Sequence, residues 1–134
     1  MIVSEIMTRE VVTVNQRQSV LEASRLLRNK GFKHLPVFGD GDKLAGIVTD
    51  RDLKRVSASD ATTLEMHELL YLLDRLKVAE VMTKEVITVP PGMPVKEAAA
   101  IILDKGVGCL PVVEAGSLLG IVTRDDFLRL MVRD

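Results

Sequence analysis

The sequence predicts a mixed α/β protein (α+β within each half), made of two pseudo-symmetric repeats that pack through their sheets. The first observation is a duplication. Met7-Thr8 returns as Met82-Thr83, and Leu-Pro-Val at 35–37 returns at 110–112, both at an offset of 75 residues. The second observation is that β-branched runs alternate with segments of helical periodicity, in the order strand, helix, strand, strand, helix in each copy. A repeat of this length is a small globular unit rather than a solenoid turn.

The duplication also predicts the domain organisation. Gly-Ile-Val-Thr at 46–49 returns at 120–123, where the offset is 74 because one loop residue is missing. We expect the first repeat at 1–56, a linker at 57–77 and the second repeat at 78–134. A single repeat would bury too little surface to be comfortably stable, so the copies are expected to share one core. Function is expected where the two like units meet.

Local signals predict each element of the first repeat. The β-branched run at 11–14 favours an opening strand. Ser19 stands three residues before a glutamate, a capping-box spacing that begins a helix, and Gly31 supplies its C-terminal stop. The apolar runs within 35–48 flank a Gly-Asp-Gly-Asp turn and predict a hairpin. A short helix is expected after Thr49.

The second repeat predicts the same elements from partly different signals. The run at 86–89 predicts the opening strand. The next helix begins at Pro94, where a missing N–H costs little, and ends at Gly106. A hairpin with an Ala-Gly turn is expected within 110–122, and a final helix after Thr123.

The linker is the part of the chain without a counterpart in the other repeat. It predicts a loop at 57–61, then a helix in which Thr62 and Glu65 have a capping-box spacing before a leucine-rich run at 69–76. The apolar residues are too numerous for one narrow face. They either pack on the two repeats or meet a second subunit, and the sequence favours neither.

Composition is typical of a compact, soluble, intracellular protein. The net charge is −1 with basic and acidic residues in balance, so no global field attracts nucleic acid or a membrane. One Tyr, three Phe and no Trp leave few stacking platforms for single-stranded nucleic acid. The single Cys109 cannot form an internal disulfide, no run reaches the roughly 18 apolar residues of a membrane span, and the N-terminus lacks a signal-peptide pattern. We expect a cytoplasmic protein.

The segment from Thr49 to Asp52 carries the main chemical signal. Thr49 stands where a strand ends and a helix begins, so its hydroxyl and the following N–H groups can face an anion. Asp52, one helical turn on, can accept two hydrogen bonds from a vicinal diol such as a ribose. The alternative is a capping box in which Asp52 only complements the helix start. The same pattern recurs at Thr123 and Asp126.

Two copies of such a unit, each with Met-Thr at its start, a Leu-Pro-Val strand and Gly-Ile-Val-Thr-x-x-Asp, resemble the cystathionine-β-synthase (CBS) domain. The pair is similar to a Bateman module, and its leucine-rich linker resembles the CBS region of acetoin-utilisation-type proteins. The resemblance covers nearly the whole chain apart from the linker. Together with the recurrence of Thr-x-x-Asp, it favours ligand binding over simple capping.

The resemblance implies two composite sites for an adenine nucleotide (AMP, ADP or ATP) or S-adenosylmethionine. In each, Thr-x-x-Asp of one copy holds ribose and phosphate, while the first strand and the segment before Leu-Pro of the other copy hold the base. One site would join Thr49, Arg51 and Asp52 to Ile87, Val107, Gly108 and Cys109. The other would join Thr123, Arg124 and Asp126 to Val12, Phe32, Lys33 and His34. For Val12, Ile87 and Phe32, a plain core role is at least as well supported.

No assembled nucleophile and base are evident, so we expect a non-enzymatic module that requires no cofactor. His34 and His67 are far apart in the chain and no Cys/His cluster exists, so no metal site is expected. We expect a regulatory sensor in which a nucleotide bridging the copies stabilises one relative orientation. The resemblance implies a homodimer, and an unidentified effector protein is a further expected partner. The alternative is a structural dimerisation module that binds no ligand.

Overall fold

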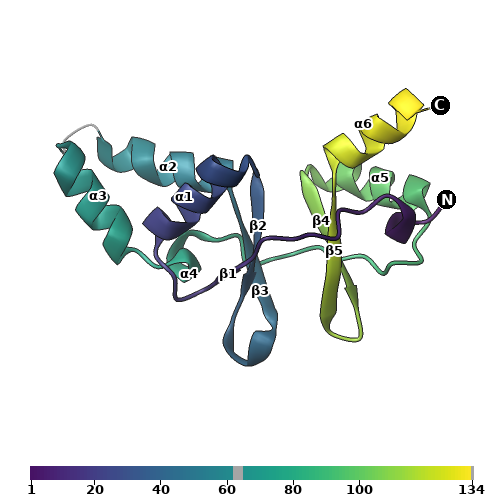
Figure 1. Cartoon of the computed structure of the whole chain (residues 1–134), viewed down its shortest axis with the longest axis horizontal. Coiled ribbons are helices and arrows are strands. Elements are labelled where there is room, and N and C mark those ends of the chain that lie inside the picture. Colours follow the sequence, from purple (N-terminus) through teal and green to yellow (C-terminus); the bar gives the residue numbers. More distant parts are fainter. Residues whose placement is uncertain (62–64, 134) are drawn as a thin grey trace. The chain divides into compact units, whose positions relative to one another are not determined.

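The computed structural model describes residues 1–61 and 65–133 and confirms the mixed α/β fold class (Figure 1). The chain divides into two compact units. We call Val12–Glu85 the central unit, and Met1–Val11 together with Val86–Asp134 the terminal unit. Each unit contains its own cluster of buried apolar side chains. Each unit thus has a core of its own, and a core shared between the two copies stays a prediction.

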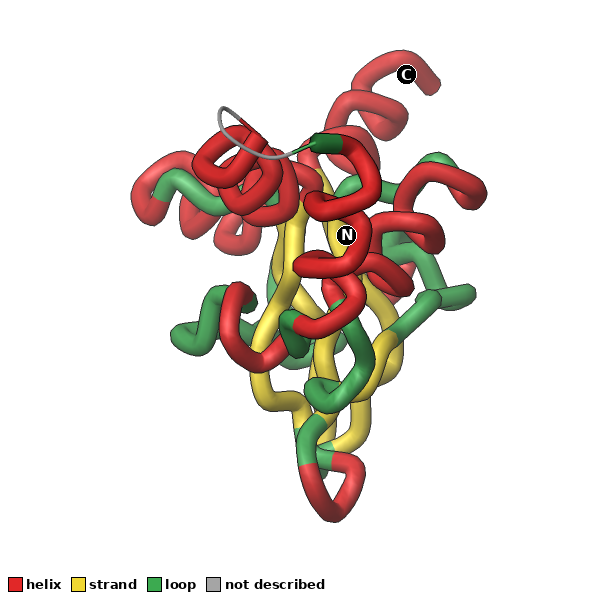
Figure 2. The backbone as a smooth tube through the Cα atoms, turned by 90° about the vertical axis from the view of Figure 1, so that its left-hand side faces the viewer, coloured by secondary structure: helices red, strands yellow, loops and turns green. Residues whose placement is uncertain are grey.

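The described residues of the central unit form a three-stranded sheet and four α-helices. In chain order its elements are β1 (Val14–Asn15), α1 (Val20–Lys30), β2 (His34–Phe38), the 3-10 turn η2 (Asp40–Asp42), β3 (Leu44–Thr49), α2 (Asp50–Ala61), α3 (Met66–Arg75) and α4 (Val78–Val81). β1 pairs parallel with β2, and β2 pairs antiparallel with β3. Figure 2 shows η2 as the short red turn at the tip of the β2–β3 hairpin.

The terminal unit contains a two-stranded antiparallel sheet. Its elements are η1 (Val3–Glu5), α5 (Val95–Lys105), β4 (Cys109–Glu114), β5 (Ser117–Thr123) and α6 (Arg124–Arg133). The β4–β5 turn has positive φ at Ala115 (51°) and at Gly116 (81°). Positive φ at both central residues is typical of a two-residue hairpin turn, so the predicted Ala-Gly turn is confirmed.

The predicted ends of the first long helix of each repeat are also confirmed. Ser19 is the N-cap of α1, and its hydroxyl accepts a hydrogen bond from the N–H of Glu22 at 3.1 Å. Pro94 is the N-cap of α5. Both helices end in a left-handed glycine, Gly31 with φ 71° and Gly106 with φ 67°. These helices were predictable because capping chemistry is local in the sequence.

The predicted opening strands are wrong in extent. The run at 86–89 forms no strand, and its pairing is a single parallel bridge from Val89 to Val112. In the first repeat the strand is Val14–Asn15 rather than 11–14. β-branched residues favour extended backbone, but a strand also requires a partner along its length, and the pairing of β1 with β2 covers only these two residues.

The predicted loop at 57–61 is also wrong, because α2 continues through it to Ala61. No Gly or Pro interrupts this segment, so nothing in its sequence ends the helix. Thr62, the other half of the expected capping box with Glu65, lies outside the described residues. Glu65 is the N-cap of α3, without a side-chain capping bond.

Each unit combines one repeat with the leading segment of the other. In the central unit, Thr83 pairs with Ile47 through hydrogen bonds of 2.8 and 2.9 Å. In the terminal unit, Thr8 pairs with Ile121 through hydrogen bonds of 2.8 and 3.0 Å. The Met-Thr segment of each repeat therefore extends the hairpin of the other repeat. This exchange replaces the leading segment of each repeat by that of the other, and the central unit also contains the linker.

The leucine-rich helix α3 divides its apolar residues between core and solvent. Leu73 is buried in the core of the central unit, and Leu69 and Leu76 pack against that core. Met66 is 71% exposed and Tyr71 is 62% exposed. One face of this helix therefore packs on the central unit, which confirms that part of the expectation, while packing on both repeats and a contact of the other face with a second subunit stay predictions.

Candidate functional site

In the central unit, the predicted Thr-x-x-Asp segment lies at a strand-to-helix junction. β3 ends at Thr49 and α2 begins at the next residue. The N–H of Thr49 donates to Oδ2 of Asp52 at 3.0 Å, and the N–H of Asp52 donates to Oγ1 of Thr49 at 3.1 Å. Nη1 of Arg55 lies 4.0 Å from Oδ1 of Asp52, which is only 8% exposed. This reciprocal cap fixes a buried carboxylate at the start of α2.

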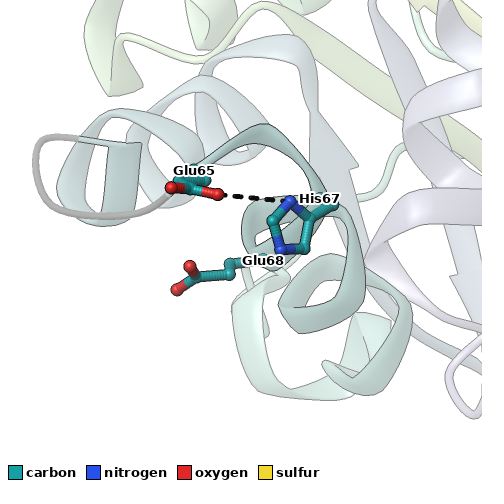
Figure 3. Close-up of side chains that lie close together, drawn as sticks. All are labelled: Glu65, His67 and Glu68. Atoms are coloured by element: carbon teal, nitrogen blue, oxygen red, sulfur yellow. Dashed lines mark ion pairs between the residues drawn. The ribbon is translucent and has the colours of Figure 1, made fainter.

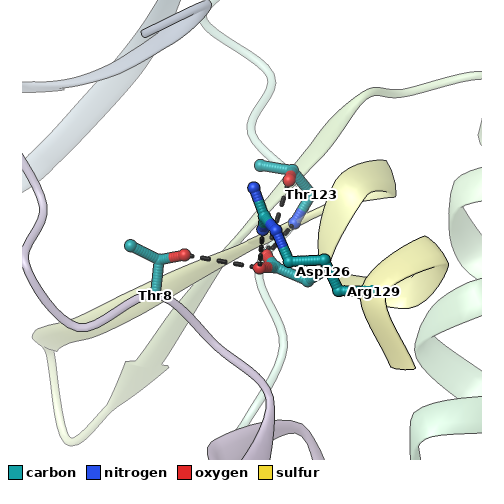
Figure 4. A network of polar contacts seen from close by, with 4 residues as sticks. All are labelled: Thr8, Thr123, Asp126 and Arg129. Atoms are coloured by element: carbon teal, nitrogen blue, oxygen red, sulfur yellow. Dashed lines mark hydrogen bonds and ion pairs between the residues drawn. The ribbon is translucent and has the colours of Figure 1, made fainter. Parts of the chain in front are cut away.

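The terminal unit repeats the arrangement with more partners, drawn in Figure 4. Oδ2 of Asp126 accepts hydrogen bonds from the N–H of Thr123 at 2.8 Å and from its hydroxyl at 3.4 Å. Oδ1 of Asp126 accepts from Nη1 of Arg129 at 3.1 Å and from the hydroxyl of Thr8 at 3.4 Å. Asp126 is 6% exposed. The carboxylate is therefore buried, satisfied and held in one orientation.

Each of the two carboxylates can accept hydrogen bonds from a diol while it also caps its helix. A carboxylate has about four acceptor positions, and the strong backbone bond to Oδ2 uses one of them. The contacts to Oδ1 of Asp126 come from side chains, and that from Thr8 is long at 3.4 Å. At Asp126, a ribose that donates two hydrogen bonds would replace the long contacts from the hydroxyls of Thr8 and Thr123, both at 3.4 Å, while the backbone cap and the contact with Arg129 stay in place.

Two contacts of Asp126 were missed from the sequence. Arg129 follows Asp126 by three residues, and this helical spacing was a usable signal, because side chains three apart on a helix are neighbours. Thr8 lies 118 residues before Asp126. Its duplication with Thr83 was visible, but the partner of either threonine was not, because the contact depends on the exchange of leading segments.

The hairpins place two further predicted residues beside the Thr-x-x-Asp segments. His34 is opposite Thr49 in the β2–β3 register, and Cys109 is opposite Thr123 in the β4–β5 register. The backbone oxygen of Lys33 accepts a hydrogen bond from the N–H of Asp50 at 3.0 Å. Within one unit, the residue before Leu-Pro is therefore the cross-strand neighbour of the site threonine.

The other predicted residues divide between core and surface. Val12 packs against the core of the central unit, and Ile87 and Val107 pack against the core of the terminal unit, which supports their core role. Gly108 is half-buried, while Phe32, Lys33, Arg51 and Arg124 are exposed. The pairing of each Thr-x-x-Asp with base-contacting residues of the other copy stays a prediction.

Cys109 is a buried thiol beside the terminal-unit site. Burial raises the pKa of Cys109 to about 12, and the negative charge of Asp126 acts in the same direction. The thiolate is the nucleophilic form of cysteine, so this environment suppresses nucleophilic chemistry. The geometry agrees with the expectation that Cys109 is a small buried residue.

One group of potential metal-ligating side chains occurs in the part of the chain that the structure describes. Glu65, His67 and Glu68 have ligand atoms within 4.8 Å of one another, and all three residues are exposed (Figure 3). Nδ1 of His67 lies 3.5 Å from a carboxylate oxygen of Glu65. The sequence predicts no metal site here, and exposed acidic groups of this kind are common without a bound ion. The helices at 1–61 and 65–133 include none that is long and apolar enough to cross a membrane.

Comparison with known proteins identifies sequence relatives that differ greatly in length. A CBS domain-containing protein of Dictyostelium discoideum is 32% identical over 133 residues, which is 98% of this chain and 92% of that protein. A homoserine O-acetyltransferase of Methanohalobium evestigatum is 32% identical over 130 residues, which is 96% of this chain and 24% of the enzyme. An inosine-5'-monophosphate dehydrogenase of Korarchaeum cryptofilum is 40% identical over 119 residues, which is 88% of this chain and 22% of the enzyme. The chain thus spans about a quarter of these enzymes.

Solved structures with the same fold include proteins crystallised with adenine-containing ligands. A protein assigned to acetoin utilization in Vibrio cholerae has a TM-score of 0.82 at 30% identity, over 99% of this chain and 91% of that chain. A CBS protein in complex with AMP has a TM-score of 0.81 at 30% identity, over 98% and 96%. A CBS domain pair in complex with 5'-methylthioadenosine and S-adenosyl-L-methionine has a TM-score of 0.82 at 27% identity, over 98% and 99%.

The CBS-domain family model matches residues 3–59 and 78–133, which together make up most of the chain. These two segments contain the repeated Met-Thr, Leu-Pro-Val and Gly-Ile-Val-Thr-x-x-Asp motifs. The chain therefore belongs to the CBS domain family and carries two CBS repeats.

Proposed function

We propose that this chain is a regulatory module that binds an adenine nucleotide or S-adenosylmethionine through Asp52 and Asp126. The observation that carries the proposal is the duplicated buried carboxylate, held by a backbone N–H at the start of α2 and again at the start of α6. A fixed, desolvated carboxylate at a helix start suits a ribose diol, with the helix N–H groups suited to phosphate. The similar structures crystallised with AMP and with S-adenosyl-L-methionine support the same ligand class.

The proposed sites are composite. Thr49, Arg51 and Asp52 would hold ribose and phosphate while Ile87, Val107, Gly108 and Cys109 of the other copy contact the base. Thr123, Arg124 and Asp126 would do the same with Val12, Phe32, Lys33 and His34. A ligand that touches both copies stabilises one relative orientation, and that change of population is the proposed signal. The module has no catalytic role in this proposal, and the proposed location is the cytoplasm.

The proposed assembly is a homodimer that acts on an effector protein. Exposed apolar side chains on helices support a further protein contact. On α3 these are Met66, Leu70 and Tyr71, and on α6 they are Leu128, Met131 and Val132. Such groups of large apolar residues on one helix are typical of interaction surfaces. Light scattering at micromolar concentration, with and without nucleotide, tests this part, and a monomer mass in both conditions would refute it.

A structural dimerisation module without ligand is the second candidate. The observation in its favour is that both carboxylates already have partners within the protein. In this alternative the repeated Thr-x-x-Asp would be a helix cap and nothing more.

The two candidates are separated by the small molecules that accompany the purified protein. We expect mass spectrometry of the heat-released fraction to detect an adenine-containing compound at near-stoichiometric amount. Calorimetric titration with AMP, ADP, ATP and S-adenosylmethionine then ranks the ligands. If no compound is released and none of the four binds at millimolar concentration, the structural candidate is correct.

A further inference from the structure

Arg129 reaches back along α6 to the start of the helix. Its Nη1 lies 3.1 Å from Oδ1 of Asp126, one turn earlier, as expected for a helical side chain that points toward the N-terminus. The two partners differ greatly in exposure. The side chain of Asp126 is 5% exposed and that of Arg129 is 62% exposed. The Arg129 side chain therefore contacts the buried carboxylate at one end and is otherwise largely exposed to solvent.

A guanidinium in this position has donors to spare. It carries five N–H groups in a planar fork, and the contact with Asp126 is made by Nη1. The Asp126 contact also fixes the orientation of the side chain, so its remaining donors are held at the helix start. This is where the N–H groups of α6 already favour an anion.

The central unit has an arginine at the same spacing. Arg55 follows Asp52 by three residues, and Nη1 of Arg55 lies 4.0 Å from Oδ1 of Asp52. The residues between each Asp and Arg differ, Leu-Lys in one copy and Phe-Leu in the other. Both copies thus have an arginine at this position, which indicates that the two arginines share a role. The contact with the aspartate is longer in the central unit, so Arg55 is held less firmly than Arg129.

We infer that Arg129 is a phosphate-binding residue of the Asp126 site, oriented for that task by its ion pair with Asp126. The inference rests on the proposed function and adds the group that distinguishes a nucleotide from a nucleoside. The ribose diol is held by Asp126, and the guanidinium beside it donates to the phosphate. Arg55 has the equivalent position beside Asp52, with a weaker orienting contact.

The experiment compares AMP with adenosine, which differ only in the phosphate. Calorimetric titrations are made in an Asp52→Asn background, where the amide can keep the backbone cap but offers a diol only one oxygen acceptor. Arg129→Gln is expected to weaken AMP binding about tenfold and to change adenosine binding less than about twofold, because a charge-assisted hydrogen bond is lost only with AMP. Arg129→Lys should fall between, since it keeps the charge without the fork. Arg133→Gln, at the exposed end of the same helix, is the matched control and should change neither ligand.

Three outcomes overturn the inference in different ways. An equal loss of AMP and adenosine binding in Arg129→Gln, with an unchanged melting temperature, means that Arg129 only positions Asp126. Unchanged AMP binding means that Arg129 does not meet the phosphate. If the parent protein, without any substitution, binds neither AMP nor adenosine, the proposed function fails and the inference fails with it. The first two outcomes leave the proposed function intact.

Discussion

The backbone oxygen of Thr83 lies 2.6 Å from the point where a Cβ of residue 46 would stand, and only glycine fits at that position. The Sδ atom of Met82 is also close, at 2.8 Å from the same point. The terminal unit repeats the contact. There, a Cβ on Gly120 would lie 2.6 Å from the backbone oxygen of Thr8 and 2.9 Å from Sδ of Met7. The repeated glycine and the repeated Met-Thr are thus two sides of one contact.

We predict that Gly46→Ala and Gly120→Ala each lower the free energy of unfolding by about 1–3 kcal/mol, the usual cost of overpacking a close contact. The obstacle is a backbone oxygen in a paired bridge, so a change of side-chain rotamer cannot relieve it. Urea denaturation followed by circular dichroism measures the effect. Gly92→Ala is the control, since a Cβ there meets nothing within 4 Å. Its free energy of unfolding should equal that of the parent. Parent-like stability of Gly46→Ala would show that the bridge to Thr83 is easily displaced.

The exchange of leading segments predicts which fragment folds. Residues 12–85 retain α3 and α4, including the fully buried Val78 and the hydrogen bond from Val20 N–H to the Leu76 oxygen at 2.8 Å. A fragment of residues 1–55 lacks both helices. We expect 12–85 to melt cooperatively in circular dichroism and 1–55 to show no cooperative transition, because the shorter fragment leaves much of its core uncovered. A cooperative melt of 1–55 alone would mean that the linear repeat, and not the compact unit, is the folding unit.

The parts of the fold that were predictable depend on local chemistry. Ser19, Gly31 and Gly106 act within a few residues of their own positions, so their capping roles can be derived from sequence. The hairpins were predictable for the same reason, because apolar alternation and turn residues lie side by side in the chain. Pairing at long range was not. The run at 86–89 has the composition of a strand, yet only Val89 is paired, in a single bridge to Val112.

The candidate site shows the same division. The cap between Thr123 and Asp126 follows from a three-residue spacing, and both its interpretations could be stated from sequence. The hydroxyl of Thr8 reaches Asp126 only because the first residues of the chain belong to the terminal unit. A sequence of two equal repeats does not reveal which repeat receives which leading segment. The exposure of the Arg129 side chain likewise could not be derived from the sequence.

The buried thiol of Cys109 predicts a specific dependence of stability on pH. Its pKa rises from an ordinary 9.0 to about 12 in the folded protein, chiefly because of burial. The unfolded chain therefore releases this proton above about pH 9 while the folded protein retains it, and stability falls as pH rises between these values. We expect the parent to lose up to about 1.4 kcal/mol per pH unit relative to Cys109→Ala over this interval.

The comparison between parent and Cys109→Ala cancels the titration of lysines and of the tyrosine, which both proteins share. Chemical denaturation at several values from pH 8 to about pH 11 supplies the difference. Alkylation provides a second check, since the folded thiol should react with iodoacetamide far more slowly than the urea-unfolded chain at pH 8.5. Parallel pH profiles for the two proteins, or rapid alkylation of the folded parent, would show that Cys109 is accessible to solvent.

Asparagine substitutions at Asp52 and Asp126 separate capping from ligand binding. The amide oxygen of Asp126→Asn can still accept the N–H of Thr123, which now lies 2.8 Å from the carboxylate. The contact with Arg129 is lost, but that side chain is 62% exposed and the ion pair contributes little through screened charge. We therefore expect Asp→Asn to change the free energy of unfolding by less than about 1 kcal/mol, while Asp→Ala, which removes the cap, costs about 1–2 kcal/mol.

Binding of an adenine nucleotide should be far more sensitive to the asparagine substitutions than the free energy of unfolding is. A ribose diol needs two acceptor oxygens, and an amide presents one oxygen and one donor group. We expect Asp52→Asn and Asp126→Asn each to remove one class of adenine-nucleotide site in calorimetry, although both proteins remain folded. Two single variants that bind as the parent does would establish that both carboxylates serve only as caps. If ligand binding and stability instead fall together in the Asn variants, the carboxylates hold the fold and not the ribose, because the loss of the site then follows from the loss of the helix start.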